Sequence, residues 1–402
     1  MRSAIGKWSC SQKAAILAGC ALAVLVALVP LLGSRARTLA SFKKVDGAPL
    51  YVLHFYGVYG FDEFLETGIA GCPDSGATGS PWGAPWACTV FAALSHESEP
   101  LLGRSFDWHN QYALLLFTHP PGGYDSASLV DVSYVGLDGG APSPAERLRV
   151  LDAPYWPFDG MNEHGLAVGM MAVPRAKDEA DPQRVTIGSL HAMRLILDQA
   201  RTVDEAISLL ESYNVDFGDG PPLHYLIADA QRNAAVIEFL GGRMNVLPNE
   251  DPWQVATNFL ISGISPQDGT RLCPRYARAY DTLQQAGGMT SPTQAMTLLA
   301  DVSQPNTLWS VVYGLTSGEI SLSMDRYYDQ VHAFSLPMQS RCAFAGQVAP
   351  WMCPSKSRSS CSIRTSSRSV RDESASTCTA PPRPFIHRRR SVPAREARLP
   401  RW

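Results

Sequence analysis

Cys88 is the strongest candidate for a catalytic residue. It stands at the start of an apolar stretch, and a second apolar stretch follows a few residues later. Residues 89–94 are apolar and β-branched and predict a buried strand. After a polar turn, residues 101–108 predict the second strand of a hairpin. This pairing would bring Arg104 and Asp107 beside the start of the first strand. A thiol, a guanidinium and a carboxylate would then share one strand end, which suits a nucleophile that acquires a base.

No histidine is obviously placed to serve as that base. If the chain is cut between Ala87 and Cys88, however, the new α-amino group lies within a few ångströms of the sulfur. An α-amine has a pKa of about 7.7–8.0 in model peptides, so it can take the thiol proton at neutral pH. Activation of a nucleophile by its own N-terminal amine is a known device. The alternative interpretation, from the hairpin alone, is an ordinary buried thiol.

Composition and charge limit the classes of function. The chain has 402 residues, of which 45% are hydrophobic and 18% charged, enough for a substantial core. Residues 339–402 carry twelve arginines and one lysine against three acidic residues, so the remainder must be acidic to reach the net charge of −3. An acidic folded part presents no basic face for nucleic acid. The cysteines lack metal-ligand spacing such as C-x-x-C, and we predict no metal or cofactor.

The first 36 residues predict a signal peptide or signal-anchor. The run from Ala14 to Gly33 has no charge and is about as long as a bilayer span, which takes roughly 20 residues. A basic start before an apolar run is typical of a secretory signal. We therefore expect an exported or membrane-tethered protein, with membrane association through residues 14–33; a buried soluble helix is the alternative.

Composition divides the rest of the chain into three parts. Residues 37–87 predict a pro-segment, which ends in a loop rich in glycine, proline and serine where a cut would be tolerated. Residues 88–337 predict the catalytic domain. Residues 338–402 lack periodicity and predict a disordered tail rich in arginine, serine and proline.

Within the domain, strands and helices alternate in groups. Strands are predicted at residues 113–117, 128–135, 165–173, 223–228, 234–240, 253–259, 308–315 and 319–324, and helices at 189–200, 202–210, 275–285 and from 291 onward. Ser291 starts the last helix with a cap, a proline at the first helical position and a capping-box glutamine. The order favours antiparallel sheets covered by helix pairs over regular βαβ units.

Two further residues could join the cysteine. Asn258 ends a predicted strand, and its side-chain amide could donate to a developing oxyanion. Arg275 opens a predicted helix and could meet a carboxylate. Position alone leaves both open to the simpler interpretation, a structural asparagine at a turn and a surface arginine.

Taken together, these pieces resemble the choloylglycine hydrolase and penicillin V acylase family of N-terminal-nucleophile amidases, which is related to acid ceramidase and N-acylethanolamine amidase. The matching elements run in the family's order from Cys88 to about Leu336: residues 88–89, 103–108, 161–167, 224–229, 257–258, 274–276 and 307–310. The resemblance implies an α+β fold, a four-layer αββα sandwich of two antiparallel sheets between helix layers. It also implies hydrolysis of a linear amide in a small N-acyl compound.

The resemblance further implies a role for each candidate residue. Cys88 matches the nucleophile that autocatalytic cleavage exposes, Asp107 the aspartate that holds the α-amine, and Arg104 the arginine close to the sulfur. Asn258 matches the oxyanion-hole asparagine and Arg275 the last arginine of the site.

One position departs from the family pattern. Bile-salt hydrolases have a second oxyanion-hole asparagine where this chain has Ala172. The second donor must therefore come from elsewhere, for example the backbone N–H of Thr89, and the departure argues against bile-salt specificity.

Three alternative functions, and the oligomeric state, stay open. An acyltransferase on the same fold would pass the acyl-thioester to an amine. A papain-like protease would need a histidine-paired cysteine, and its usual local signature is missing. A non-catalytic, membrane-tethered binding protein would stay uncut. Whether the protein forms a homo-oligomer is not decided by the sequence.

Overall fold

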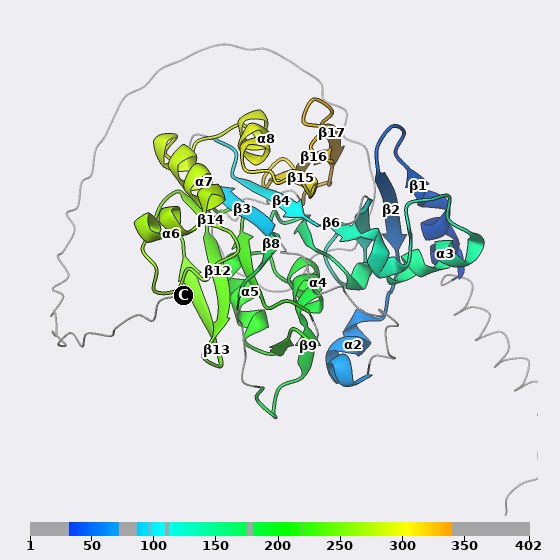
Figure 1. Ribbon diagram of the computed structural model, residues 1–402. Helices are drawn as coiled ribbons and strands as arrows, with labels where there is room; N and C mark the ends of the chain where they lie inside the picture. Colours follow the sequence, from blue (N-terminus) through cyan, green and yellow to red (C-terminus); the bar gives the residue numbers. More distant parts are fainter. Residues whose placement is uncertain are drawn as a thin grey trace, which may run out of the picture. The chain divides into compact units, whose positions relative to one another are not determined.

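A computed structural model of the chain describes residues 32–71, 87–95, 98–108, 112–174, 180–218 and 220–339 (Figure 1). These residues belong to one compact unit that ends at Arg341, and a second unit, Cys342–Trp402, lies outside the described part. The predicted tail, residues 338–402, therefore lies outside it too, except for its first two residues. The division into pro-segment, catalytic domain and tail stays a prediction.

The structure contradicts the prediction of export or membrane tethering. Among the residues described, no helix is long and apolar enough to cross a membrane. The apolar run at residues 14–33, which carried that prediction, lies outside the described residues except for its last two.

The larger sheet contains nine strands within the described residues, and one pair in it is parallel. In spatial order these are β1 (Lys43–Lys44), β2 (Leu50–Tyr56), β5 (Ala113–His119), β6 (Ser126–Asp131), β7 (Asp159–Asn162), β8 (Ala167–Ala172), β11 (Leu223–Ala228), β12 (Ala234–Leu240) and β13 (Arg243–Pro248). The parallel pair is β2 with β5, so the segment predicted to precede the cut supplies β1 and β2 to this sheet.

The smaller sheet contains six strands in the same described part, all antiparallel to their neighbours. Their order is β14 (Trp253–Ala256), β3 (Ala87–Ala93), β4 (Leu101–Asp107), β15 (Thr307–Gly314), β16 (Glu319–Met324) and β17 (His332–Ser335). A separate short pair joins β9 (Thr186–Gly188) to β10 (Asn214–Asp216) in parallel. The central strands β3 and β4 are the predicted hairpin.

The two large sheets face each other, and helices cover their outer faces. On one side α4 (Ser189–Gln199) packs on β7 and β8 with α5 (Val203–Leu210) beside it; on the other, α7 (Pro274–Gln285) packs on β14 and β3, and α8 (Pro292–Asp301) on β15 and β4. The helix α6 (Pro266–Leu272) lies against α7. Of two further helices, α3 (Pro144–Arg149) lies at the β1–β2 end of the larger sheet (Figure 1), and α2 (Phe61–Thr67) lies near α4, where its Phe64 ring meets His191. The predicted α+β class, with antiparallel sheets between helix layers, is confirmed.

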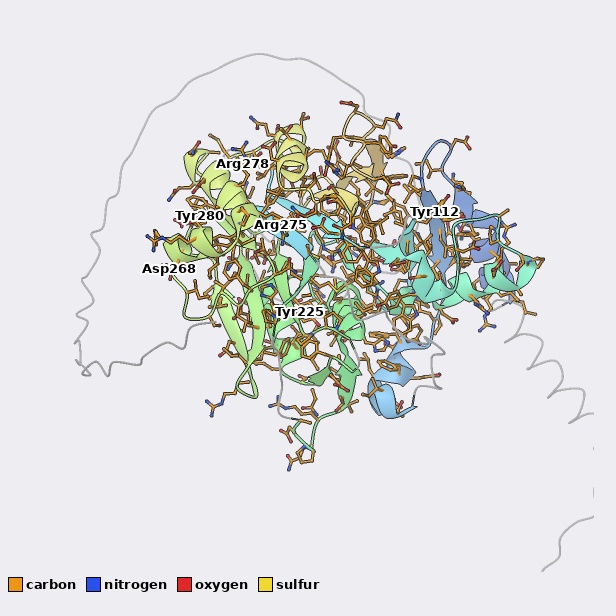
Figure 2. The ribbon with its side chains drawn as sticks, in the orientation of Figure 1. Tyr112, Tyr225, Asp268, Arg275, Arg278 and Tyr280 are labelled. Atoms are coloured by element: carbon orange, nitrogen blue, oxygen red, sulfur yellow. The ribbon has the colours of Figure 1, made fainter. Side chains whose placement is uncertain are left out.

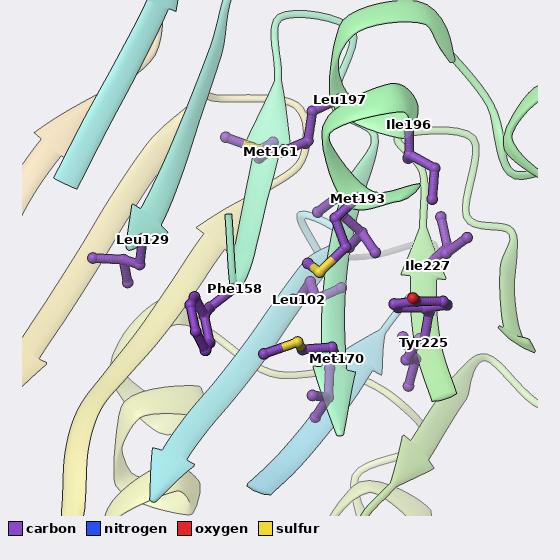
Figure 3. Close-up of a cluster of buried hydrophobic side chains, with 14 of the residues drawn as sticks. Leu102, Leu129, Phe158, Met161, Met170, Met193, Ile196, Leu197, Tyr225 and Ile227 are labelled. Atoms are coloured by element: carbon purple, nitrogen blue, oxygen red, sulfur yellow. The ribbon is translucent and has the colours of Figure 1, made fainter. Parts of the chain in front are cut away.

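Apolar side chains fill the space between these layers (Figure 2). Against the outer face of the larger sheet, α4 buries Met193, Ile196 and Leu197, which recur at helical spacing and point toward the strands (Figure 3). Met170 and Tyr225 belong to the strand face that meets them. The apolar face of α4 thereby fixes which side chains of β8 and β11 point away from the smaller sheet.

Glycine permits the close approach of the two sheets at their centre. A Cβ at Gly169 of β8 would lie 3.1 Å from a methyl group of Val90 and 3.3 Å from the Arg104 side chain. Both contacts are tighter than ordinary van der Waals distance, so any larger residue would push β8 away from β3 and β4. The Arg104 guanidinium lies in this interior, where it contacts Cys88 and Asp159.

Candidate active site

Cys88 lies at the start of β3, with its side chain in the interior between the sheets. It pairs with Phe106 of β4, and Ala87 pairs with Asp107. Only 1% of Cys88 is exposed.

Arg104 reaches the sulfur from the neighbouring strand. Its Nη2 lies 3.8 Å from the Cys88 Sγ and 3.2 Å from the carbonyl oxygen of Met170. Burial raises the pKa of the Cys88 thiol, and the positive charge of Arg104 opposes that rise. The guanidinium therefore favours the thiolate at a position where burial alone would suppress it.

Asp159 anchors Arg104 on the side away from the sulfur. The two form an ion pair with both side chains fully buried. The Asp159 carboxylate also accepts hydrogen bonds from Trp309 Nε1, at 2.9 Å, and from the Tyr313 hydroxyl, at 2.6 Å. Three donors thus satisfy one buried carboxylate and orient the arginine.

The carboxyl group of Asp107 has a raised pKa. Burial raises its pKa to about 6, against opposing effects of the Thr307 hydrogen bond and of Arg275 and Arg104. Thr307 Oγ1 donates to its Oδ1 at 2.5 Å. Its Oδ2 lies 3.9 Å from Arg275 Nη1 and accepts no hydrogen bond from the described residues. One oxygen of this carboxylate is therefore free to receive a new donor.

Asn258 connects the cysteine to both sheets. Its Oδ1 accepts hydrogen bonds from the Cys88 N–H, at 2.7 Å, and from Arg275 Nη2, at 2.8 Å. Its Nδ2 donates to the carbonyl oxygen of Ala172, at 2.8 Å. The residue follows the end of β14, where pairing with β3 stops at Ala256. The side chain can therefore turn inward toward the start of β3.

Arg275 completes the cluster from the first turn of α7, where Figure 2 labels it. Its Nη1 donates to the Cys88 carbonyl oxygen and, at 3.0 Å, to Thr89 Oγ1. The structure thus brings together all five residues that the sequence predicted as a site. Their catalytic roles stay predictions.

Sequence reasoning missed Asp159. Its acidic character next to the 161–167 element was a signal, but its partner Arg104 lies 55 residues away and is supplied by the other sheet. Ala172 contributes its carbonyl oxygen rather than a side-chain donor, which agrees with the departure noted above. In the part of the chain that is described, no group of three His, Cys, Asp or Glu side chains could hold a metal ion.

Residues 156–326 match the family model of acyl-coenzyme A:6-aminopenicillanic acid acyl-transferase. The matched stretch contains Asp159, Asn258 and Arg275. It confirms the predicted resemblance to the choloylglycine hydrolase and penicillin acylase group for this part of the chain.

A curated relative is an uncharacterized protein of Paramecium bursaria Chlorella virus 1. It is 29% identical over 110 residues, which are 25% of this chain and 39% of the relative. The chain thus spans about two fifths of the length of that relative.

Two solved structures are similar in part. A conjugated bile acid hydrolase mutant from Clostridium perfringens is 15% identical with a TM-score of 0.47, covering 62% of this chain and 92% of its own. Penicillin V acylase from Agrobacterium tumefaciens is 19% identical with a TM-score of 0.43, covering 59% of this chain and 83% of its own. Both TM-scores are below 0.5, so neither likeness supports an assignment of activity.

Proposed function

We propose that the protein hydrolyses a linear, non-peptide amide bond of a small N-acyl compound, with Cys88 as an N-terminal nucleophile. The observation that carries the proposal is the surroundings of Cys88. Its sulfur faces a buried guanidinium, and its backbone nitrogen is held by Asn258 beside Asp107 and Arg275. A structural cysteine needs none of these polar groups around its backbone nitrogen.

Maturation begins with attack of the Cys88 sulfur on the Ala87 carbonyl carbon. We assign the thiol proton in this step to the Asp107 carboxylate, because Asp107 pairs with Ala87 in the strand ladder and its charge acts on the Cys88 thiol. The peptide C–N bond breaks as the acyl group moves from nitrogen to sulfur, and Asp107 returns the proton to the departing nitrogen. Water then hydrolyses the thioester and leaves a carboxylate on Ala87 and a free α-amine on Cys88.

In turnover the α-amine takes the role of the base. It removes the thiol proton, and the resulting thiolate attacks the substrate carbonyl. The Asn258 amide, released from Ala172, and a backbone N–H stabilise the tetrahedral oxyanion, each worth about 3–4 kcal/mol. The α-ammonium, held by Asp107, protonates the leaving amine, and water clears the acyl-thioester.

Acyl transfer is the second candidate, because the matching family model is named for an acyl-transferase. Both activities share the acyl-thioester on Cys88 and differ in whether water or an amine resolves it. A hydrolase forms the free acid whether or not an amine is present. A transferase forms a new amide when an amine is added, at the expense of the acid.

Processing of the purified protein tests the nucleophile. We expect N-terminal sequencing to find a chain that begins at Cys88. Cys88→Ala should remain one uncut chain on a denaturing gel, and Cys88→Ser should be cut at least tenfold more slowly because a hydroxyl is a weaker nucleophile. Full processing of Cys88→Ala, or an active protein in which Ala87 is still joined to Cys88, would refute the mechanism.

Product analysis tests the reaction. The processed protein is incubated with penicillin V, a glycine-conjugated bile acid and an N-acylethanolamine, each with and without an added amine. Formation of the same amount of free acid with and without the added amine supports the hydrolase. Formation of an amide of the added amine supports the transferase. A processed protein that cleaves and transfers none of them contradicts both activities for these substrate classes.

A further inference from the structure

A histidine and a glutamate are buried together between the two sheets, next to the site but outside the mechanism above. His224 of β11 and Glu238 of β12 are both fully buried. Tyr225, the next residue of β11, points to the helix side, where its hydroxyl donates to the Ser189 carbonyl of α4. Because side chains alternate along a strand, His224 and Glu238 face the smaller sheet.

Their contacts lie on either side of Asn258. His224 Nε2 is 2.7 Å from the carbonyl oxygen of Thr257, the residue before Asn258. Glu238 accepts the backbone N–H of Ile261, at 2.5 Å, and of Ser262, at 3.0 Å. The ring and the carboxylate join each other, with His224 Nδ1 3.3 Å from Glu238 Oε1.

Hydrogen bonds keep the Glu238 carboxylate ionised. Burial would raise the pKa of Glu238, but hydrogen bonds from His224, Ser262 and Ile261 hold it below its ordinary value, so the carboxylate is ionised. Both ring nitrogens of His224 therefore face acceptors, a carbonyl oxygen and a carboxylate. Since a carbonyl oxygen only accepts, Nε2 is the donor in the bond to Thr257.

We propose that Glu238 and His224 form a positioning pair that holds the segment 257–262, and with it Asn258, at the start of β3. This inference rests on the proposed role of Asn258 in the oxyanion hole. Thr257 has left the strand ladder, so its carbonyl needs a partner from the other sheet, and His224 supplies it. A displacement of Asn258 by about an ångström would lower the rate of attack on the substrate carbonyl rather than the affinity for the substrate.

Three variants separate positioning from simple packing. His224→Phe removes both ring nitrogens while filling the space, and His224→Gln keeps one donor toward Thr257. Glu238→Gln keeps the shape but loses the charge that accepts two backbone N–H groups. The matched control is His191→Phe, since His191 is also buried but lies on α4, on the opposite face of the larger sheet.

The experiment measures kcat and KM of the processed enzyme on the panel member that the wild type cleaves fastest. We expect His224→Phe to lower kcat about 10- to 100-fold with KM changed less than threefold. His224→Gln should recover at least a third of the wild-type kcat. His191→Phe should lower the melting temperature with kcat unchanged, and a wild-type kcat in His224→Phe would overturn the inference.

Hydrogen exchange of the full chain gives a readout that does not depend on activity. The amides of Ile261 and Ser262 should exchange at least tenfold faster in Glu238→Gln than in the wild type, and His191→Phe should leave them protected. Unchanged protection in Glu238→Gln overturns the positioning pair even if no substrate is known. Missing processing of the wild type, with the exchange result as expected, overturns the proposed function and leaves the pair standing.

Discussion

At the scale of single residues, the site combines a thiol that burial keeps protonated with a carboxyl that burial brings into the neutral range. Asp107 has its pKa raised to about 6, and in the mechanism we propose its ionised form accepts the thiol proton in the first cleavage. Below that pH the base is neutralised. The proposed mechanism therefore predicts that one buried carboxyl sets the acid limb of maturation.

We expect the rate of cleavage before Cys88 to fall tenfold per pH unit below about pH 6 and to level off above it. The measurement is the disappearance of uncut chain on a denaturing gel after a pH jump. Asp107→Asn should be cut slowly at every pH, without this limb. A wild-type rate that is flat from pH 4 to 8 would contradict the assignment.

Titration of Asp107 does not itself destabilise the fold over this acid limb, because its linkage has the opposite sign. A carboxyl whose pKa is raised on folding binds more protons in the folded state, so its contribution to stability grows as pH falls from about 6 to about 4. For Asp107 the gain is at most about 3 kcal/mol. The unfolding free energy of the wild type relative to Asp107→Asn should rise over the same range in which cleavage stops.

At the scale of elements, the close contact of β8 with β3 and β4 holds Arg104 against the sulfur. We expect Gly169→Ala to lower the free energy of unfolding by about 1–3 kcal/mol, because its Cβ would press on Val90 and Arg104. It should also slow cleavage before Cys88. Gly33→Ala, which meets no atom within 4 Å, is the control. If denaturant melts gave the same free energy of unfolding for both variants, this account of Gly169 would be wrong.

The elements themselves were largely predictable, because their patterns are local. The hairpin of β3 and β4, the strands β11, β12 and β16, and the capped start of α8 follow from apolar periodicity and capping residues. The prediction for residues 128–135 was too long, since Asp131 caps a 3-10 turn over Val132–Val135. The half-exposed edge strand β13 was missed because its side chains alternate weakly.

The residues of the site were predictable where hairpin register or a family motif indicated them. Arg104 and Asp107 follow from hairpin register, since both lie on the strand that pairs with Cys88. The contacts of Asp159 with Arg104 and of His224 with Thr257 do not follow from register. Each joins residues of the two different layers, which meet only when the sheets stack. No local pattern reports which polar residues meet across two layers.

At the scale of the whole described unit, the segment before the cut is part of the fold. Strand β2 pairs with β5 along its full length, and its Leu50 and Leu53 are fully buried. Farther along, the Tyr59 hydroxyl donates to the Asp198 carboxylate of α4. Burying each such apolar side chain is worth about 2 kcal/mol, so the two leucines and their neighbours favour retention strongly.

We therefore expect the processed protein to remain a complex of two chains, one that contains residues 37–71 and one that begins at Cys88. Both should elute together in size-exclusion chromatography in buffer and separate in denaturant. Tyr59→Phe should weaken the complex, because the buried Asp198 carboxylate loses a donor, whereas the exposed Val58→Ala should leave it intact. A fully active chain from Cys88 that elutes alone would mean that β2 serves only folding. Retention would mean that cleavage frees the amine without dismantling the sheet that supports it.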